Sequence, residues 1–435
     1  MCIIRKNMLK LNRRKRGGYM GSMITLGIGR MEIDWGKNSS FRDHSVLFKT
    51  SDVKPIPYYY VDMDSDEPII ELKEGYARKL SNIKRRLDLL GYDLASIRKM
   101  FEDSVQEHQE YGYKIKLSFD VFYDVLRAIN ISEIDTVKLA VEFEENGYDF
   151  GGYARRCVLN APQVKGKLLV EYEEVEDNEY QDPEGEVSEF LENLDPYITL
   201  RILADNPTNA EQEVFWGFAD VVENGWVRRD EVVRGLPLEK RILIVTEGSS
   251  DSYVLRKAID QLFPDISDFF DFVDMNENYP FTGTGSLYNF CMGLCRINIQ
   301  NNIIAIFDND TAGLEKYHHS QTLQKPDSFV ITKLPDYQEF SSICTLGPQG
   351  SSMENINGRA VAIECFLDFS SVQKTPCVRW TSYNKNERQY QGELENKDEY
   401  TRAFKQCDLT DGSYDSTKLE FLIEYIISQW IDRKK

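Results

Sequence analysis

The chain has 435 residues, which is enough for two or three domains with a sizeable core. Its formal net charge of −20 argues against a broad electrostatic grip on nucleic acid. Its 8 cysteines form no C-x-x-C pair, and the sequence contains no secretory signal and no membrane-length apolar run, so we expect a cytoplasmic protein without a membrane partner.

The chain opens with a basic segment that is followed by alternating apolar residues. Residues 1–19 are rich in Lys and Arg, and we expect them to form a disordered tail. From residue 23 onward, apolar side chains alternate on both sides of a Gly29-Arg30 turn, first Ile24, Leu26 and Ile28 and then Met31, Ile33 and Trp35. This period of two predicts a β-hairpin.

Three helices are predicted after the hairpin. Apolar residues recur on one face from Leu72 to Leu90, a second helix runs through Val105, and a third covers residues 118–130. The opening MGSMITLGIGRMEIDWGKN, together with this helical region, resembles the N-terminal domain attached to HEPN or Toprim effectors in bacterial defence loci. The Arg-to-His spacing of HEPN ribonucleases is absent, and no other catalytic constellation is recognisable here, so we expect a regulatory or recognition domain.

An acidic tract and further helical spacing complete the first half of the chain. Residues 171–195 contain twelve Asp or Glu and no Lys or Arg, which indicates a solvated loop or, alternatively, a mask over a basic groove. Residues 187–235 then resume helical spacing through Phe215. A strand-rich pattern begins directly after Pro237, so the predicted domains are 20–237 and 238–435.

The second domain begins with a strand, a turn and a helix. The short apolar run from Ile242 to Val245 predicts a buried parallel strand. Gly248 allows a sharp turn, and either of the two serines after it can cap the helix that follows. Glu247 is therefore expected at the carboxyl end of the strand, with Asp251 about one turn into the helix.

A strand over residues 269–275 and a helix after a Gly-Thr-Gly-Ser turn are predicted next. The buried face of this helix is expected to consist of Leu287, Phe290, Cys291, Leu294 and Ile297. Gly283 and Gly285 could present backbone N–H groups to a phosphate, although a Gly-x-Gly sequence is more often a plain turn.

A second acidic turn repeats the first. The apolar strand from Ile303 to Phe307 runs directly into Asp308-Asn309-Asp310, so both aspartates project from a strand end, the edge where open parallel sheets bind ligands. If the two acidic strands are neighbours, four carboxylates converge and repel unless a hard cation such as Mg2+ or Mn2+ lies between them. For either turn taken alone, an ordinary helix N-cap is the alternative.

The paired motifs TEGSSD and IFDNDTAG resemble the Toprim domain of bacterial primases, type IA and type II topoisomerases and overcoming-lysogenization-defect nucleases. The resemblance implies an α/β fold with a Rossmann-like, mostly parallel sheet flanked by helices, placed after an α+β, mainly helical N-terminal domain. It implies that Glu247, Asp308 and Asp310 bind Mg2+ and act on phosphodiester bonds. Asp251 resembles the extra acid of the nuclease branch.

Two further residues follow from the same resemblance. Nuclease-type Toprim domains add a late acid, and Glu364 is the best placed, one turn before Asp368 if the segment is helical; an exposed surface acid is the alternative. A Lys often follows the last acid, and Lys397, or failing it Arg379, is expected to contact the scissile phosphate. The alternative for Lys397 is a surface salt bridge with neighbouring acids.

These features favour a Mg2+-dependent endonuclease that acts on DNA or RNA, including tRNA, as an anti-phage effector. The sequence contains no Walker A motif, so the ATPase of overcoming-lysogenization-defect nucleases is absent from this chain. The alternative is a non-catalytic nucleic-acid sensor or adaptor that uses the Toprim fold for binding. The sequence does not decide whether the substrate is DNA or RNA, whether a partner ATPase or inhibitor controls the protein, or whether the chain forms a homo-oligomer.

Overall fold

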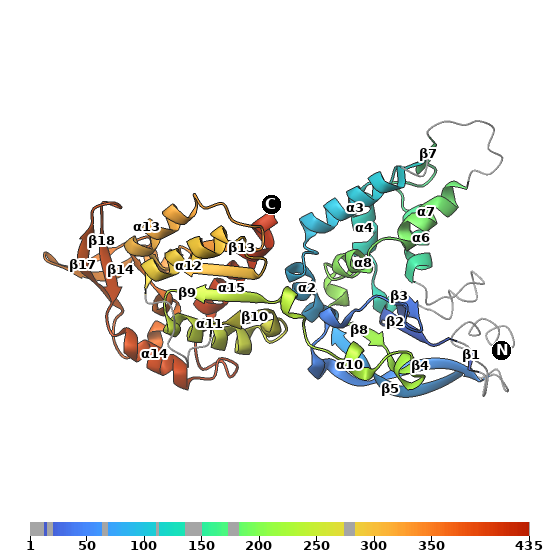
Figure 1. Cartoon of the computed structure of the whole chain (residues 1–435), viewed down its shortest axis with the longest axis horizontal. Helices are drawn as coiled ribbons and strands as arrows, with labels where there is room; N and C mark the ends of the chain where they lie inside the picture. The colour runs from blue at the N-terminus through green and yellow to red at the C-terminus, as the bar shows by residue number, and fades with distance from the viewer. Residues whose placement is uncertain are drawn as a thin grey trace. The chain divides into compact units, whose positions relative to one another are not determined.

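The computed structural model describes residues 13–14, 21–62, 68–109, 113–134, 150–172, 182–273 and 283–434. The chain divides into two compact units, Met1–Leu236 and Pro237–Lys435 (Figure 1). Of the predicted basic tail, Arg13–Arg14 is described and forms a two-residue strand, while the rest of residues 1–19 lies outside the described residues.

Six strands form one sheet in the Met1–Leu236 unit. In spatial order they are β1 (Arg13–Arg14), β4 (Val53–Asp62), β5 (Pro68–Lys79), β8 (Glu213–Gly217), β2 (Met23–Ile28) and β3 (Met31–Lys37). The predicted hairpin is confirmed, because β2 and β3 pair antiparallel around Gly29, whose φ of +60° favours glycine. Ile24, Leu26 and Ile28 are buried in the main core of this unit, as their alternation predicts.

The helix predicted from Leu72 is wrong in its first part, because Leu72 and Tyr76 lie on β5 and the helix begins at Leu80. A spacing of four residues places side chains on one face of a strand as well as of a helix, so the pattern fitted both. Pairing of β5 with β4 and β8 decides for the strand. Phe215, also predicted helical, lies on β8. The first domain therefore contains more sheet than the mainly helical fold that the sequence predicts.

Helices pack with this sheet in the same unit. They are α2 (Leu80–Leu89), α3 (Leu94–Gln109), α4 (Phe119–Arg127), α6 (Phe150–Asn160), α7 (Pro183–Glu192), α8 (Pro196–Leu203), α9 (Ala219–Glu223) and α10 (Arg229–Val232). A small antiparallel sheet joins β6 (Tyr113–Ile115) to β7 (Val170–Tyr172). The second and third predicted helices are confirmed by α3 and α4.

The acidic tract over residues 171–195 is not a single loop. Helix α7 occupies ten of its positions, and the Asp182 carboxylate caps that helix by accepting a hydrogen bond from the Gly185 N–H at 2.9 Å. Asp and Glu near a helix N-terminus favour the helix through its dipole, so the acidic composition is compatible with helical structure. Residues 173–181 of the tract lie outside the described residues.

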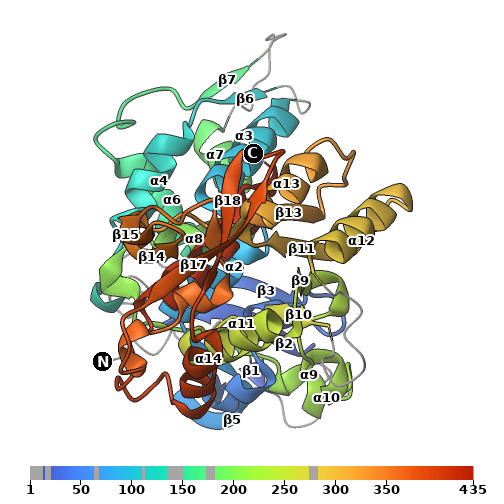
Figure 2. The same cartoon turned by 90° about the vertical axis from the view of Figure 1, so that its left-hand side faces the viewer.

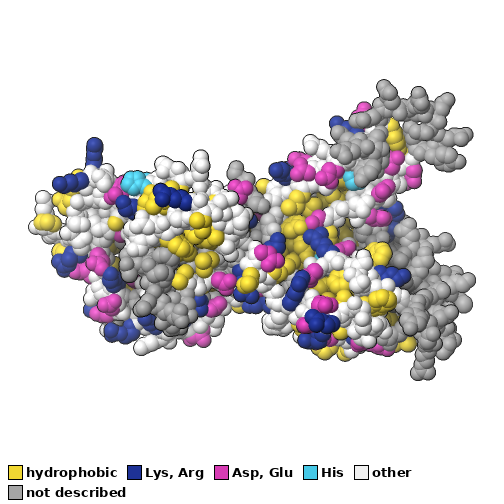
Figure 3. Space-filling view, in the orientation of Figure 1, with side chains coloured by type: hydrophobic (Ala, Val, Ile, Leu, Met, Phe, Trp, Pro, Cys, Tyr) yellow, Lys and Arg dark blue, Asp and Glu magenta, His cyan; other side chains and the backbone are white. Residues whose placement is uncertain are grey.

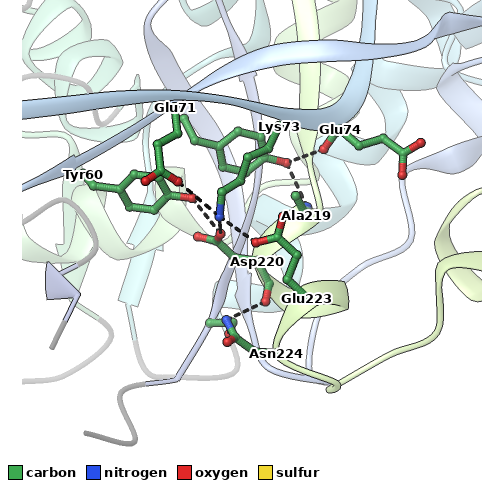
Figure 4. A network of polar contacts seen from close by, with 10 residues as sticks. Tyr60, Glu71, Lys73, Glu74, Ala219, Asp220, Glu223 and Asn224 are labelled. Atoms are coloured by element: carbon green, nitrogen blue, oxygen red, sulfur yellow. Dashed lines mark hydrogen bonds and ion pairs between the residues drawn. The ribbon is translucent and has the colours of Figure 1, made fainter. Parts of the chain in front are cut away.

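A polar cluster ties α9 to β4 and β5 (Figure 4). Lys73 Nζ lies 2.9 Å from Asp220 Oδ1 and 2.7 Å from Glu223 Oε2, and the Tyr60 hydroxyl donates to Asp220 Oδ1 at 2.6 Å. The Lys73 side chain is only 9% exposed. We refer to Tyr60, Lys73, Asp220 and Glu223 as the Lys73 cluster. Within it, a buried cation is paired with nearby carboxylates.

Four parallel strands form the central sheet of the Pro237–Lys435 unit. In spatial order they are β10 (Phe270–Phe272), β9 (Ile242–Thr246), β11 (Asn302–Phe307) and β13 (Phe329–Lys333). The strand expected over 269–275 is shorter than predicted, and residues 274 and 275 lie outside the described residues. The expectation of an α/β fold with a parallel sheet is thereby met for the described part of this unit.

Helices cover both faces of the parallel sheet. Figure 1 shows α12 (Thr284–Arg296) and α13 (Thr311–Ser320) above β9 and α11 (Ser249–Leu262) below it. Leu287 and Cys291 of α12 are buried in one core with Ala305 of β11, because a parallel sheet buries both faces. Ile297, predicted to share this face, is 69% exposed, since α12 ends at Arg296.

A second sheet and two helices complete this unit. The sheet lies toward the viewer in Figure 2 and consists, in order, of β15 (Gly350–Glu354), β14 (Ile343–Gly347), β17 (Cys377–Asn384) and β18 (Gln389–Leu394). The short strands β12 (Asn309–Asp310) and β16 (Ala360–Val361) pair antiparallel. The last helices are α14 (Lys397–Gln406) and α15 (Thr417–Ile431). No helix in the described ranges is long and apolar enough to cross a membrane.

Candidate functional site

Glu247 and Asp308 follow two adjacent strands, as the sequence predicts. Strands β9 and β11 are parallel neighbours with Thr246 opposite Ile306, so both acids emerge at the same edge of the sheet. The Asp308 N–H donates to Glu247 Oε1 at 3.0 Å, and the Thr284 hydroxyl donates to Glu247 Oε2 at 2.7 Å. Both oxygens of Glu247 are therefore held by residues from other parts of the sheet edge.

The Gly-Thr-Gly turn contributes differently from the expected phosphate loop. The Gly283 N–H donates to the Glu247 backbone carbonyl at 3.1 Å, so this donor is already used within the protein. Thr284, at the start of α12, supplies the hydroxyl that holds the Glu247 side chain. Sequence reasoning singled out the glycines and missed the threonine between them.

Asp251 lies in the first turn of α11, about where the sequence places it. Its Oδ2 accepts from the Gly248 N–H at 2.9 Å and its Oδ1 from the Ser250 hydroxyl at 3.1 Å. The residue at the N-cap is Gly248, not a serine as predicted. Asp251 thus satisfies a backbone donor at the helix start and also faces the other acids.

Asp310 caps α13 and joins the same edge. Its Oδ1 accepts from the Gly313 N–H at 2.7 Å, and its Oδ2 accepts from the side-chain amide of Gln391. A Cβ at Gly313 would lie 2.1 Å from the Asp308 carbonyl oxygen, so glycine is required for the helix to start this close. Asp310 is therefore the N-cap of α13, as the alternative interpretation of this turn expects. It also lies at the same sheet edge as the other acids.

Glu364 joins the acids and Asp368 does not. Glu364 lies in a short 3-10 helix, Ile363–Phe366, and is close enough to raise the pKa values of Asp251 and Asp308. Asp368 instead caps the next 3-10 turn by accepting from the Ser370 N–H at 2.7 Å. The expected one-turn helical relation is absent because the chain is extended between the two 3-10 turns.

Burial raises the pKa of every carboxyl group in this set, which we call the acidic site: Glu247, Asp251, Asp308, Asp310 and Glu364. Burial raises the pKa of Asp251 to about 7, with Glu364 as the next cause. Burial also raises the pKa of Asp308 well above its usual range, and the charges of the four other acids add to this. The five carboxyl groups thus form one electrostatic cluster.

The acidic site lacks a cationic partner of its own among the described residues. None of its five carboxylates forms an ion pair with a described Lys, Arg or His, and all five are partly exposed. A set of oxygen ligands with excess negative charge fits a hard divalent cation in chemical type. Within the described ranges, however, no three His, Cys, Asp or Glu side chains are arranged so that they could hold a metal ion together.

Protein donors already bind three of the five carboxylates. Oxygens of Glu247, Asp251 and Asp310 accept from backbone N–H groups. Each carboxylate oxygen has two lone pairs, so it can accept such a hydrogen bond and still face a cation. The five carboxylates therefore fit Mg2+ or Mn2+ by charge and ligand type. In the positions that they occupy, three of them accept hydrogen bonds from backbone N–H groups.

The two cations that the sequence proposed for phosphate contact form surface ion pairs. Lys397, the first residue of α14, pairs with Glu393, and its side chain is 46% exposed. Its positive charge partly offsets the rise in the pKa of Glu364, which places Lys397 beside the acidic site. Arg379 pairs with Glu395, with Nε 2.9 Å from Oε1. Lys397 is therefore near the acids. Both Lys397 and Arg379 form surface salt bridges, which is the alternative that the sequence offered for Lys397.

Gln391 is the partner of the acidic site that sequence reasoning missed. It lies on β18 and reaches Asp310, which is 81 positions earlier in the chain. No local sequence signal marks a glutamine in a strand as such a partner. Thr284, by contrast, lies in a turn that the sequence had already marked.

Comparison with known protein families gives a match in the first half of the chain. The family model described as HEPN/Toprim N-terminal domain 1 matches residues 20–240. The match covers just over half of the chain and confirms the resemblance predicted for the first domain, and it does not extend into the acidic site. No curated protein and no solved structure matches the chain.

Proposed function

Because the chain belongs to the HEPN/Toprim N-terminal domain 1 family, we propose that it is a metal-dependent nuclease whose Pro237–Lys435 unit is a Toprim domain that hydrolyses phosphodiester bonds in DNA or RNA. The family description links this N-terminal domain to HEPN and Toprim domains. The acids at the ends of β9 and β11 form the proposed active site. The anti-phage role is proposed from the resemblance of the N-terminal domain to domains of bacterial defence loci.

The observation that carries the proposal is the uncompensated charge of the acidic site. Five carboxyl groups with raised pKa values face one another at the carboxyl edge of a parallel sheet, where ligands of open α/β sheets bind. Proteins do not collect like charges without a compensating function, because each further charge raises the free energy of the folded state. Carboxylates that share a divalent cation satisfy this requirement.

Mg2+ or Mn2+ would be held by Glu247, Asp251, Asp308, Asp310 and Glu364, and when bound it would polarise the phosphodiester and lower the pKa of an attacking water. The residues of the chain fix this set in place. Thr284 and the Asp308 N–H orient Glu247, and the N-terminus of α13 orients Asp310. Partial exposure leaves the edge open to a substrate phosphate.

Lys397 would assist from outside the carboxylate set. It is exposed, lies near enough to Glu364 to affect its pKa, and is held by a surface ion pair that costs little to break. A substrate phosphate would replace Glu393 as its partner. The transition state of phosphodiester hydrolysis carries extra negative charge, which a nearby Lys stabilises.

Recognition of nucleic acid is expected to be local. On the face drawn in Figure 3, Lys and Arg side chains are scattered among Asp and Glu, in line with the net charge of −20. Local contacts at the acidic site, rather than broad attraction, would then set affinity. We propose that the matched N-terminal domain supplies target choice or control, with a separate ATPase, an inhibitor or a second copy as its partner.

The test is cleavage by the purified full chain. Plasmid DNA, single-stranded DNA and tRNA are incubated with protein and Mg2+ or Mn2+, with EDTA and the Asp308→Asn variant as controls. Cleavage that needs the divalent ion and Asp308 supports the proposal. Binding of these nucleic acids without cleavage, and without measurable Mn2+ binding, would instead support the non-catalytic sensor.

A further inference from the structure

Gln391 connects the second sheet to the acidic site through three hydrogen bonds. Its side-chain NH2 donates to Asp310 Oδ2. Its Oε1 accepts from the Thr311 hydroxyl and, at 3.2 Å, from the Ala312 N–H. The Ala312 N–H can only donate, so the oxygen end of the amide must face α13 and the NH2 end must face Asp310. The amide orientation is therefore fixed by its partners.

The strand that carries Gln391 is itself held against the strand of Asp310. The Gly392 N–H donates to the Arg359 carbonyl at 3.0 Å, next to β16. A Cβ at Gly392 would lie 2.8 Å from the Ala360 Cβ, so β18 and β16 are in close contact. Ala360 is in turn the pairing partner of Asp310. The strand of Gln391, β18, thus packs on β16, which pairs with β12, the strand of Asp310.

We infer that Gln391 is a positioning residue of the acidic site, which holds the Asp310 carboxylate in one orientation for a divalent cation; this inference rests on the proposed nuclease function. Asp310 Oδ1 is already bound to the Gly313 N–H at 2.7 Å. Gln391 fixes the remaining oxygen, so the carboxylate cannot rotate. Hydrogen-bond partners of metal ligands change metal affinity or activity by about 10- to 100-fold when they are removed.

Gln391 also gives the second sheet a role at the acidic site. The parallel sheet and its helices already provide every acid except Glu364, and β18 adds no acid to the site. What β18 brings is a neutral amide, which can donate to a carboxylate without neutralising its charge. A Lys or Arg in this place would form an ion pair with Asp310 and compete with the cation. A glutamine orients the carboxylate and leaves its negative charge available.

Three variants separate hydrogen bonding from packing, with Gln389→Ala as the matched control. Gln389 is the same residue type on the same strand, two positions away, and it is exposed. Gln391→Met keeps the length of the side chain and removes its hydrogen bonds. Gln391→Ala removes the side chain as well. Gln391→Glu replaces the donor with a second carboxylate facing Asp310.

Two quantities are measured on the full chain: Mn2+ affinity by calorimetry, and kcat and KM on the best nucleic-acid substrate. Gln391→Met and Gln391→Ala should both weaken Mn2+ binding and lower kcat by about 10- to 100-fold with little change in KM, while Gln389→Ala matches wild type. Gln391→Glu should lower kcat further, because its charge repels Asp310. Thermal unfolding of Gln391→Met in EDTA should stay close to wild type.

The outcomes distinguish this inference from the proposed function. Wild-type Mn2+ affinity and kcat in Gln391→Met, with loss only in Gln391→Ala, would show that Gln391 acts by packing and would overturn the inference alone. A wild-type chain that neither binds Mn2+ nor cleaves nucleic acid would overturn the proposed function and this inference with it.

Discussion

Among the described residues, two groups of acids differ in whether a cation is built in. In the Lys73 cluster, Lys73 lies within 2.9 Å of Asp220 and 2.7 Å of Glu223, and the Asp220 side chain is 7% exposed. In the acidic site, burial raises the pKa of all five carboxyl groups, and the charges of neighbouring acids add to this at Glu247, Asp251 and Asp308. None of the five forms an ion pair with a described basic residue. The first group contains a built-in cation, and the second does not.

This difference separates a structural cluster from a candidate reactive one. A buried acid with a paired cation contributes to the fold, and removing one partner leaves an unpaired buried charge. Acids without a cation destabilise the fold by repulsion, and such groups are found where function requires shifted pKa values. Each prediction below removes one member of one group.

Asp308→Asn should have the largest effect on activity. Removing this central carboxylate should lower the cleavage rate at least about 1,000-fold, or about 4 kcal/mol of transition-state stabilisation. Because it also relieves repulsion among the remaining acids, the variant should unfold at a higher temperature than wild type in EDTA. Cleavage assays and thermal unfolding in EDTA measure the two effects. Glu247→Ala should likewise abolish cleavage, and retained cleavage in either variant with an unchanged circular dichroism spectrum would remove these residues from the proposed site.

Lys73→Met should have the largest effect on stability. It leaves Asp220, whose side chain is 7% exposed, buried without its cation, which costs about 3 kcal/mol. Hydrogen–deuterium exchange should therefore speed up in β5 and α9, while Mn2+ binding at the acidic site is retained. Lys54→Met is the matched control, because Lys54 pairs with Glu213 on the surface of the same unit with 45% of its side chain exposed. An exposed pair of this kind contributes about 0–1 kcal/mol, so equal exchange in the two variants would contradict the contrast.

The metal-free chain should lose stability as pH rises. The pKa of Asp251 is raised to about 7 in the folded chain from an ordinary value of 3.8. Between these two values the folded chain keeps a proton that the unfolded chain has lost, so the free energy of unfolding falls as pH rises through this window. This group contributes a loss of about 4 kcal/mol over the whole window, of which about 3 kcal/mol falls between pH 5 and pH 8. Thermal midpoints in EDTA at pH 5 and pH 8 measure the loss. Asp251→Asn should show a smaller loss, and an identical pH dependence in both proteins would contradict the raised pKa.

Lys397→Ala should have the smallest effect and still exceed its control. If Lys397 contacts the substrate phosphate, kcat falls about 10-fold with little change in KM. Lys374 provides the control, because its side chain is 45% exposed and pairs with Glu399 in a similar surface ion pair. Cleavage kinetics of Lys397→Ala and Lys374→Ala therefore compare two similarly exposed, ion-paired lysines, of which Lys397 acts by its charge on Glu364. Equal kinetics in both variants would return Lys397 to an ordinary surface role.

Local sequence patterns determined the elements that carry the acids. The apolar runs before Glu247 and Asp308 are short and followed at once by turn residues, which is enough to specify strand ends. The amphipathic helix at the C-terminus and the β2–β3 hairpin are likewise encoded by periods of 3.6 and two residues. These signals depend only on neighbouring residues, so the sequence alone reveals them.

Tertiary structure decided the features that depend on distant partners. Leu72 and Tyr76 fit a strand and a helix equally well, and only the pairing of β5 with β4 and β8 selects the strand. Glu364 joins the acidic site and Asp368 does not, because backbone geometry between them is extended rather than helical. Thr284 meets Glu247 across 37 positions, and Gln391 meets Asp310 across 81. Contacts of such separation arise from the packing of whole strands and helices, which no short stretch of sequence encodes.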